Sequence, residues 1–451
     1  MSKDTKTTMR PERERTWYES GHASLCVLGP YLRRAGIFTA LEERVQIKQK
    51  VLKYTAVQKL EMLFVALLAG AKAVVQTGTT LRVDPALCWA FGLPGCAEQS
   101  VIADTLDAAT MDDVAALQEA VAAVFARYSQ ARHHDDAQEV LVVDIDLSPL
   151  PASARAEGST RGYMGRHRSK TGRKLVRVRA APYQETIWET VIPGRLVESL
   201  PVLQEAITQM EQLLGVAGED EVAQAKRARI ELRLDSGWGT DTILPWLLDR
   251  GYQVTGKFRS PARVRALVKD ITAWTPTSSQ GREVAAVPHP VAFARPLRQY
   301  AVRTPSTQTK SGYCQAVLFT TRTDLSMTEV VDQYDGRAGM EADLKGDKRG
   351  LGLGVIRKHR LPAQMVVVLL TQLAHNVLIW ARGWLAERAP RLRRCGIVRL
   401  IQEVWAVPGR VKVRAAQVQR VRLCRAHPQA RDVCTGLRPL LSPSQSLALL
   451  G

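Results

Sequence analysis

The first part of the chain has a helical pattern of apolar and polar positions. Between residues 43 and 134, apolar side chains recur three or four positions apart, as in EERVQIKQKVLKYTAVQKLEMLFVALLAGAKAV. Leu93-Pro94-Gly95 interrupts the pattern, and the stretch after it suits a further short helix. Two arrangements fit this region equally well: a helix-turn-helix unit or an ordinary helical bundle.

The pattern changes at about residue 140, where short β-rich runs alternate with helical ones. We predict strands in EVLVVDIDLSPLP (139–151), KLVRVRAAP (174–182), ETIWETVIPG (185–194), RARIELRLD (227–235) and YQVTGKF (252–258). LPVLQEAITQMEQLLG (200–215) and DTILPWLLDRGY (241–252) have helical spacing. Strands followed by helices predict an α/β domain.

The α/β pattern is interrupted and then resumes. Residues 256–325 lose helical periodicity and predict antiparallel strands, whereas SMTEVVDQYDGRAGMEADLKGDK (326–348) predicts one helix, with a possible break at Gly346. AQMVVVLLTQLAHNVLIWARGWLAE (363–387) is apolar all round, so we expect it to pack under the sheet. GRVKVRAAQVQRVRL (409–423) is strand-like. The predicted regions are 1–137, 138–255 with 326–395, 256–325, and a basic 396–451.

Charge and cysteine usage narrow the class of protein. The formal net charge of the 451 residues is +19, which favours a polyanionic partner. The seven cysteines are scattered without a Cys-x-x-Cys pair, as expected in a reducing cytoplasm. The N-terminus lacks the apolar core of a signal peptide, and no apolar run reaches membrane-spanning length. We therefore expect a cytoplasmic protein without a membrane partner.

Acidic residues stand where metal sites form in α/β proteins. Asp144 and Asp146 share one face of the first predicted strand, and Asp235 ends a later strand. Glu341 lies in a predicted helix. Mg²⁺ prefers such oxygen ligands, and two ions about 4 Å apart can activate an attacking oxygen and stabilise a leaving one. An acid near a strand end is nevertheless more often a helix cap or a solvated loop residue.

The predicted helix around Glu341 has charged residues and a tyrosine along one face. At about 100° per residue, Tyr334, Arg337, Glu341 and Lys348 fall within roughly 60° of one another. Three charges make a poor core face, but they suit a metal and a phosphate backbone. The alternative is a solvated face on which Arg337 and Glu341 pair along the helix. Periodicity alone gives the two interpretations equal weight.

These residues resemble a known family. Tyr334-x2-Arg337-x3-Glu341-x6-Lys348 is similar to the Tyr-Arg-Glu-Lys signature of the insertion-sequence-four superfamily of bacterial DDE transposases. DIDLSPLP with GSTRGYMGRH, LRLDSGWGTDTILPWLLDRGYQVTGKF and QLAHNVLIWARGWL look like segments of its thirteen-eighty group. The similarity covers roughly residues 85–430.

The resemblance implies a ribonuclease-H-like catalytic core with a β-strand insertion and a helical N-terminal DNA-binding region. It also implies recognition of the terminal inverted repeats of a mobile element, with Mg²⁺-dependent strand cleavage and transfer into target DNA, Mn²⁺ being a possible substitute. The catalytic and metal-binding acids would be Asp146, Asp235 and Glu341. Asp146 matches the family pattern better than Asp144, although Ser148 stands where Thr is commoner.

Further roles follow from the same resemblance. Tyr334, Arg337 and Lys348 would position the DNA end, and synapsis of two ends implies a dimer on double-stranded DNA. The basic segment 161–179, beside the first Asp, is interpreted as facing DNA rather than as a solvated turn. Two other functions stay open: a metal-dependent nuclease of the same fold without strand transfer, and a domesticated DNA-binding protein without catalysis.

Overall fold

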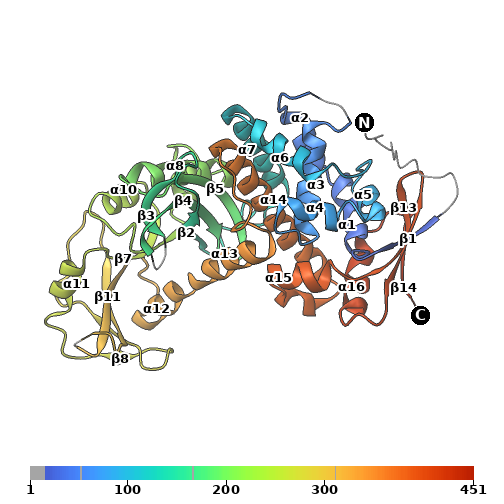
Figure 1. Ribbon diagram of the computed structural model, residues 1–451. Coiled ribbons are helices and arrows are strands. Elements are labelled where there is room, and N and C mark those ends of the chain that lie inside the picture. Colours follow the sequence, from blue (N-terminus) through green and yellow to red (C-terminus); the bar gives the residue numbers. More distant parts are fainter. Residues whose placement is uncertain (1–15, 51–52, 165–166, 310, 451) are drawn as a thin grey trace. The chain divides into compact units, whose positions relative to one another are not determined.

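The computed structural model describes residues 16–50, 53–164, 167–309 and 311–450, so the polar segment 1–15 and residues 165–166 of the basic segment lie outside it. The chain forms two compact units (Figure 1). Unit 1 consists of Met1–Tyr128, Leu150–Thr160 and Asp343–Gly451, and unit 2 consists of Ser129–Pro149 and Arg161–Ala342. The boundary at residues 342 and 343 lies inside one helix.

Unit 1 is mainly helical. Its helices are α1 (Leu25–Arg34), α2 (Ile37–Arg44), α3 (Ala56–Leu68), α4 (Thr77–Thr80), α5 (Pro85–Ala90), α6 (Gln99–Ala108), α7 (Met111–Tyr128), α14 (Leu361–Ala386), α15 (Ile397–Arg399) and α16 (Ala430–Leu437). At the start of α3, Thr55 accepts a hydrogen bond from the Gln58 backbone while the Gln58 side chain accepts from the Thr55 N–H, a reciprocal pair that fixes where the helix begins.

Helix α14 is the central element of unit 1. It packs against α3, α6, α7 and α16, and nearly all of its side chains are buried. Within unit 1 its apolar surface is covered by other helices on several sides, and our expectation that it packs under the sheet stays a prediction. It is the one helix in the described ranges that is long and apolar enough to cross a membrane, and that stretch is fully buried inside the protein.

A small sheet completes unit 1. Its strands are β1 (Thr16–Ser20), β12 (Gly409–Arg414), β13 (Gln417–Cys424) and β14 (Ser446–Leu450), in that order. Neighbours are antiparallel except for β13 and β14, which are parallel. The strands predicted within residues 409–423 are confirmed. Their two-residue turn, Ala415-Ala416, has positive φ at both positions, as tight hairpin turns require.

Unit 2 is built on one large sheet with the order β3-β4-β2-β6-β7-β11-β10-β9-β8, and β5 also pairs with β4. The strands are β2 (Leu141–Pro151), β3 (Thr160–Met164), β4 (His167–Ala180), β5 (Glu185–Pro193), β6 (Ile230–Leu234), β7 (Gln253–Lys257), β8 (Thr275–Pro276), β9 (Glu283–Ala286), β10 (Arg298–Pro305) and β11 (Tyr313–Thr320). β2, β6 and β7 are parallel, whereas β7 and β11 are antiparallel. The strands predicted within 256–325 therefore extend the same sheet.

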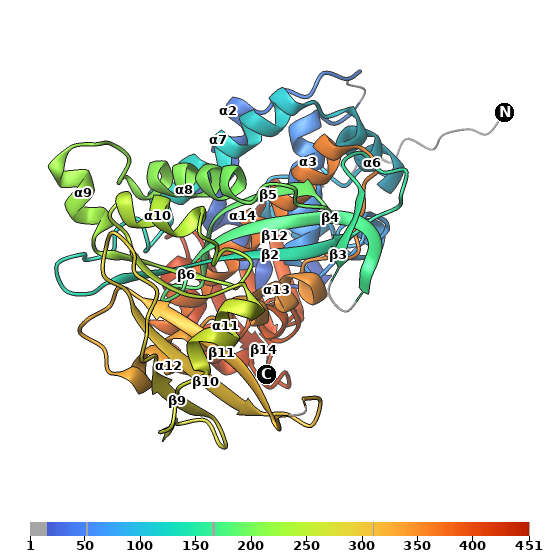
Figure 2. The same cartoon turned by 90° about the vertical axis from the view of Figure 1, so that its left-hand side faces the viewer.

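The two faces of this sheet differ in chemistry. α8 (Leu200–Leu214) and α10 (Ile243–Asp249) lie on one side, and α12 (Met327–Asp335) and the start of α13 (Ala338–Gly350) lie on the other (Figure 2). On β6, alternate residues are apolar, at 230, 232 and 234, and charged, at 231 and 233. The charged set faces α12, because Glu231 and Arg233 both bond to Gln333. Two further helices of unit 2 are α9 (Glu221–Arg227) and α11 (Pro261–Val268).

Residues 326–348 form two helices, so the prediction of one helix is wrong. Ser326 caps the start of helix α12 by forming a capping box with Glu329, and the helix ends at Asp335. Gly336 and Arg337 form a turn, and α13 then runs without interruption through Gly346, where we had allowed for a break. The change of direction comes at Gly336, next to the Arg233 guanidinium, at a position where a side chain would collide with it.

Candidate active site

Three carboxylates surround the guanidinium of Arg337. Its Nη1 lies 3.3 Å from Oδ1 of Asp146, and its Nη2 lies 3.4 Å from Oδ1 of Asp235 and 3.8 Å from Oε1 of Glu341. All four residues belong to unit 2. The three acids predicted from the sequence, which are far apart along the chain, therefore lie around one cationic side chain.

Strand register explains why the acids meet. β2 and β6 are parallel neighbours in which Asp144 pairs with Arg233 and Ile145 with Leu234. Asp146 and Asp235 each follow one position later, so both stand where β6 ends. Glu341 lies in the first turn of α13, on the same side of the sheet as Arg337.

Burial differs among these side chains. Asp146 and Arg337 are 15% and 13% exposed, whereas Asp235 and Glu341 are 42% and 69% exposed. Burial raises the pKa of Asp146, which Arg337 lowers in part and Asp235 raises further. Burial also disfavours the charge of Arg337, but Asp146 and Asp235 outweigh it and raise the pKa of that guanidinium. The site thus has a buried ion pair on one side and water-accessible carboxylates on the other.

The donor chemistry fits a hard divalent cation, because all three acids offer carboxylate oxygens. Across the part of the chain that the structure covers, no three His, Cys, Asp or Glu side chains are gathered closely enough to share one metal ion. At this site, Arg337 stands between the carboxylates. Its Nη1 is buried and makes no hydrogen bond of good geometry, although it lies 3.3 Å from Asp146. A cation of higher charge density could take its place if Arg337 turned away.

Asp144, the alternative first acid, is engaged elsewhere. Its carboxylate is fully buried and accepts hydrogen bonds from Arg233 Nε at 2.7 Å and Arg233 Nη2 at 2.9 Å. Arg179 Nη1 also donates to it, at 3.2 Å. A carboxylate held by two guanidinium groups has little capacity left for a metal ion. The geometry therefore favours Asp146 over Asp144.

The same charged layer fixes α12 to the sheet. Arg233 Nη1 donates to the backbone oxygen of Gln333 at 2.5 Å, and the Gln333 side chain donates to Glu231 at 2.6 Å. Arg322 also pairs with Glu231, at 2.6 Å. Sequence reasoning missed these positioning residues. The alternation of charged and apolar residues in IELRLD is typical of a strand with one solvated face, so it gave no signal that α12 covers the charged face.

Of the other two residues of the sequence motif, Tyr334 adjoins this cluster, because Arg337, Asp235 and Asp146 all act on its phenol. Tyr334 is 8% exposed and packs with Val284, Tyr300, Val302, Leu318, Val330 and Val331. Burial raises the pKa of Tyr334 to about 12. Lys348 is half-buried and lies farther along α13, in unit 1. The roles of both residues in positioning DNA stay predictions.

The interpretation of segment 161–179 as facing DNA is wrong for three arginines of its second half, whereas Lys174 between them is only half-buried. Arg173, Arg177 and Arg179 are all less than 4% exposed. Arg177 pairs with the buried Glu189 of β5, and Arg179 pairs with Asp144. These arginines alternate with apolar residues on β4, so they fill the charged face of a sheet that is covered on both sides.

Comparison with known proteins gives a match among solved structures but none by sequence. The sequence matches no protein-family model and no curated protein. Among solved structures, the chain is similar to the piggyBac transposase in a cryo-EM structure of its synaptic complex with hairpin DNA. The two share 11% sequence identity with a TM-score of 0.48, over 96% of this chain and 85% of that chain.

Proposed function

We propose that this protein is a DNA transposase in which Asp146, Asp235 and Glu341 hold divalent cations for strand cleavage and strand transfer. The observation that carries the proposal is the convergence of these three acids on Arg337. Asp146, from β2, and Asp235, from the end of β6, reach Arg337 only through the tertiary fold, whereas Glu341 lies four residues from it along the chain. Arg33, Arg250 and Arg322 each pair with two carboxylates, whereas Arg337 has three around it.

The residues divide into those that would react with DNA and those that position them. The three acids are the proposed metal ligands, and bound Mg²⁺ would act as a Lewis acid on the reacting phosphate and lower the pKa of its bound water. Arg337, once released from the acids, can bind a phosphate oxygen in the bidentate manner typical of arginine. Asp144, Arg233 and Glu231 hold the strands and α12 in register beneath them.

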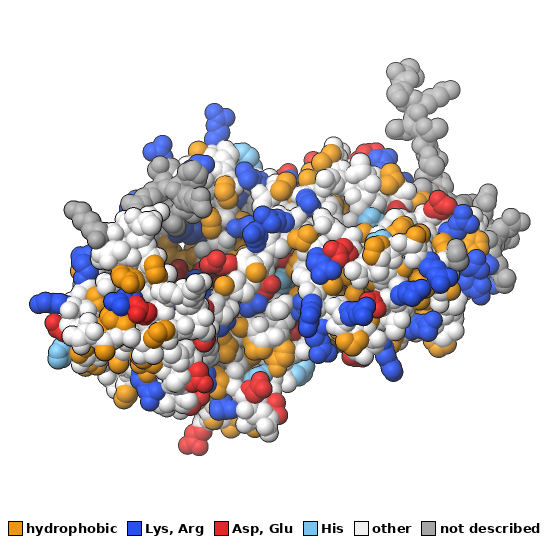
Figure 3. Space-filling model, turned by 90° about the horizontal axis from the view of Figure 1, so that it is seen from below, with side chains coloured by type: hydrophobic (Ala, Val, Ile, Leu, Met, Phe, Trp, Pro, Cys, Tyr) orange, Lys and Arg blue, Asp and Glu red, His pale blue; other side chains and the backbone are white. Residues whose placement is uncertain are grey.

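Fold and charge support the same proposal. The strand order β5-β4-β2-β6-β7, with β2, β6 and β7 parallel, is compatible with the ribonuclease-H-like core that the sequence resemblance implies. The net charge of +19 suits a DNA partner. Figure 3 shows Lys and Arg side chains over much of one face of the molecule, with Asp and Glu side chains among them. We further propose a cytoplasmic protein that acts as a dimer on the terminal inverted repeats of its element.

A strand-transfer assay tests this function. The substrate is the DNA that flanks the gene of this protein, supplied with target DNA and Mg²⁺. The natural sequence should cleave the end and join it to the target, whereas Glu341→Gln should do neither. Asp343→Asn is the matched control, because it lies two positions along the same helix and about 200° round it.

Each alternative gives a different result. Cleavage without joining would indicate a plain nuclease, and DNA binding without cleavage would indicate a domesticated binding protein. Full cleavage by Glu341→Gln would overturn the assignment of the site.

A further inference from the structure

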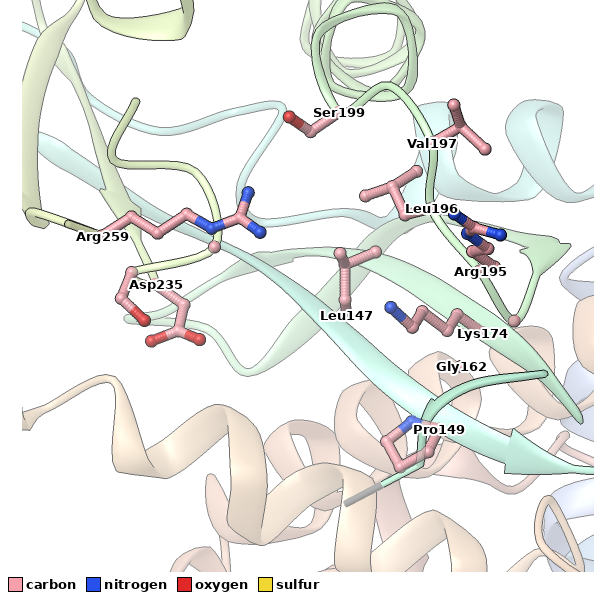
Figure 4. A pocket seen from close by; sticks show the side chains of 13 residues that line it. Leu147, Pro149, Gly162, Lys174, Arg195, Leu196, Val197, Ser199, Asp235 and Arg259 are labelled. Carbon is pink, nitrogen blue, oxygen red and sulfur yellow. The ribbon is translucent and has the colours of Figure 1, made fainter. Parts of the chain in front are cut away.

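A cavity of about 520 Å³ opens beside Asp235, within unit 2. It is lined by Leu147, Pro149, Gly162, Lys174, Gly194, Arg195, Leu196, Val197, Ser199, Asp235, Ser236, Gly237 and Arg259 (Figure 4). One wall depends on a close approach of backbones, since a side chain at Gly162 would collide with the backbone oxygen of Gly194. The volume lies in the range of small-ligand sites, so it suits one nucleotide and excludes a duplex.

Two cations of this cavity lack an acidic partner. Lys174 and Arg259 make no ion pair with any residue in the described ranges. Their charged ends point toward each other from either side of Leu147 (Figure 4). Burial lowers the pKa of Lys174, and repulsion from Arg259 lowers it further. Two cations that repel each other across a cavity favour an anion between them.

The remaining surface of the cavity suits the rest of a nucleotide. Leu147, Leu196 and Val197 form an apolar side, and Val197 is 84% exposed, which is unusual for its type. Ser199, which precedes α8 and lines the cavity, makes no side-chain capping bond, so its hydroxyl is not committed to the helix.

The position of the cavity relates it to the proposed active site. Asp146 and Leu147 are consecutive on β2, so their side chains point to opposite faces of the sheet. Asp146 faces Arg337, and Leu147 faces the cavity. Asp235, beyond the end of β6, belongs to both the proposed active site and the cavity, because it contacts Arg337 and lines the cavity. A DNA strand that crosses the end of the sheet at Asp235 would pass from the side of Arg337 to the side of the cavity.

We propose that this cavity binds one unpaired nucleotide of the substrate strand, next to the phosphate that reacts. Its phosphate lies between Lys174 and Arg259, and its sugar and base lie against Leu147, Leu196 and Val197. The inference rests on the proposed function and adds to it a subsite for single-stranded DNA.

DNA binding without divalent cations tests the subsite separately from catalysis. Two probes are compared by fluorescence anisotropy across a range of salt concentrations: the blunt gene-flanking duplex, and the same duplex with a short single-stranded extension. Lys174→Gln and Arg259→Gln should each weaken binding of the extended DNA several-fold. Each should also reduce the slope of log affinity against log salt by about 0.7, the value for one single-strand phosphate contact. Blunt DNA should bind as it does to the natural sequence.

Arg265→Gln is the matched control, because Arg265 is an exposed cation of α11 that does not line the cavity. Arg259 is itself exposed, so its variant keeps the test informative if Lys174→Gln disturbs the sheet. Equal losses on blunt and extended DNA, or no loss on either, would overturn the subsite. Loss of the proposed function has a different signature, which is cleavage that survives Glu341→Gln.

Discussion

Asp144 and Arg233 face each other across the parallel strands β2 and β6 and form a buried ion pair with two hydrogen bonds, at 2.7 and 2.9 Å. Two residues farther along β2, Asp146 meets Arg337 instead. The first pair lies inside the sheet layer, and the second lies at its edge. Two acids in the same short segment therefore have different physical surroundings, which leads to different expectations for their substitution.

Asp144→Asn should damage folding, and Asp146→Asn should damage catalysis. Loss of the Asp144 charge leaves Arg233 and Arg179 buried without their carboxylate, which costs about 3–5 kcal/mol of unfolding free energy. Asp146→Asn should cost far less stability and abolish DNA cleavage. Urea denaturation and the cleavage assay, run on both variants, measure the two effects. A stable Asp144→Asn protein without activity would make Asp144 the catalytic acid.

Arg337→Gln should increase the stabilisation that Mg²⁺ provides. In the natural sequence the guanidinium neutralises the three acids, so a bound cation must displace it. Without it, the carboxylates repel one another and gain more from the ion. We expect the Mg²⁺-dependent rise in unfolding free energy to grow by about 1 kcal/mol, which corresponds to an Mg²⁺ affinity that is several-fold higher. Thermal denaturation with Mg²⁺ and with EDTA measures it, with Arg265→Gln as the charge-matched control.

Glu61 in α3 should make unit 1 less stable as the pH rises. Burial raises the pKa of Glu61 to about 7, although Arg33 pairs with it at 2.8 Å. A carboxyl whose pKa is raised on folding contributes stability below its ordinary pKa, and this contribution is lost as the pH rises through about 7. The loss between pH 4.5 and pH 7 is about 3 kcal/mol.

Glu61→Gln carries no titrating proton, so its stability should change less over this window. Urea denaturation at half-unit steps of pH compares it with the natural sequence. Parallel curves for the two proteins would show that Glu61 does not titrate there.

The contributions of His375 and Asp347 to the unfolding free energy should be coupled. His375 Nδ1 lies 2.8 Å from Asp347 Oδ1, and both side chains are fully buried in unit 1. His375→Phe leaves the carboxylate without this partner and should cost about 3–5 kcal/mol. Adding Asp347→Leu should recover part of the loss, because two apolar groups leave no uncompensated charge. A double-mutant cycle measures the coupling, and additive losses would show that the pair does not act as a unit.

The sequence predicts this molecule best where one periodicity governs a segment. Strands β2, β5, β6 and β7 and helices α8 and α10 lie where alternation and helical spacing place them. The helix predicted across Gly336 fails because its apolar and charged stripe continues through the turn, so the pattern does not mark where α12 ends. At the site, Asp146 and Asp235 could be predicted because they stand near strand ends in the sequence pattern. The partners of Asp144 could not be predicted, because cross-strand register is a tertiary property.

The alternation along β6 has a consequence for assembly. Its residues at 230, 232 and 234 are apolar, and those at 231, 233 and 235 are charged. A slip of one residue against β2 would place Glu231 and Arg233 in the apolar layer beneath α8 and α10, and leucines in the charged layer beneath α12. Such a misaligned sheet could not survive as a compact structure. The alternation along β6 therefore favours the one register against β2 in which Asp146 and Asp235 stand side by side.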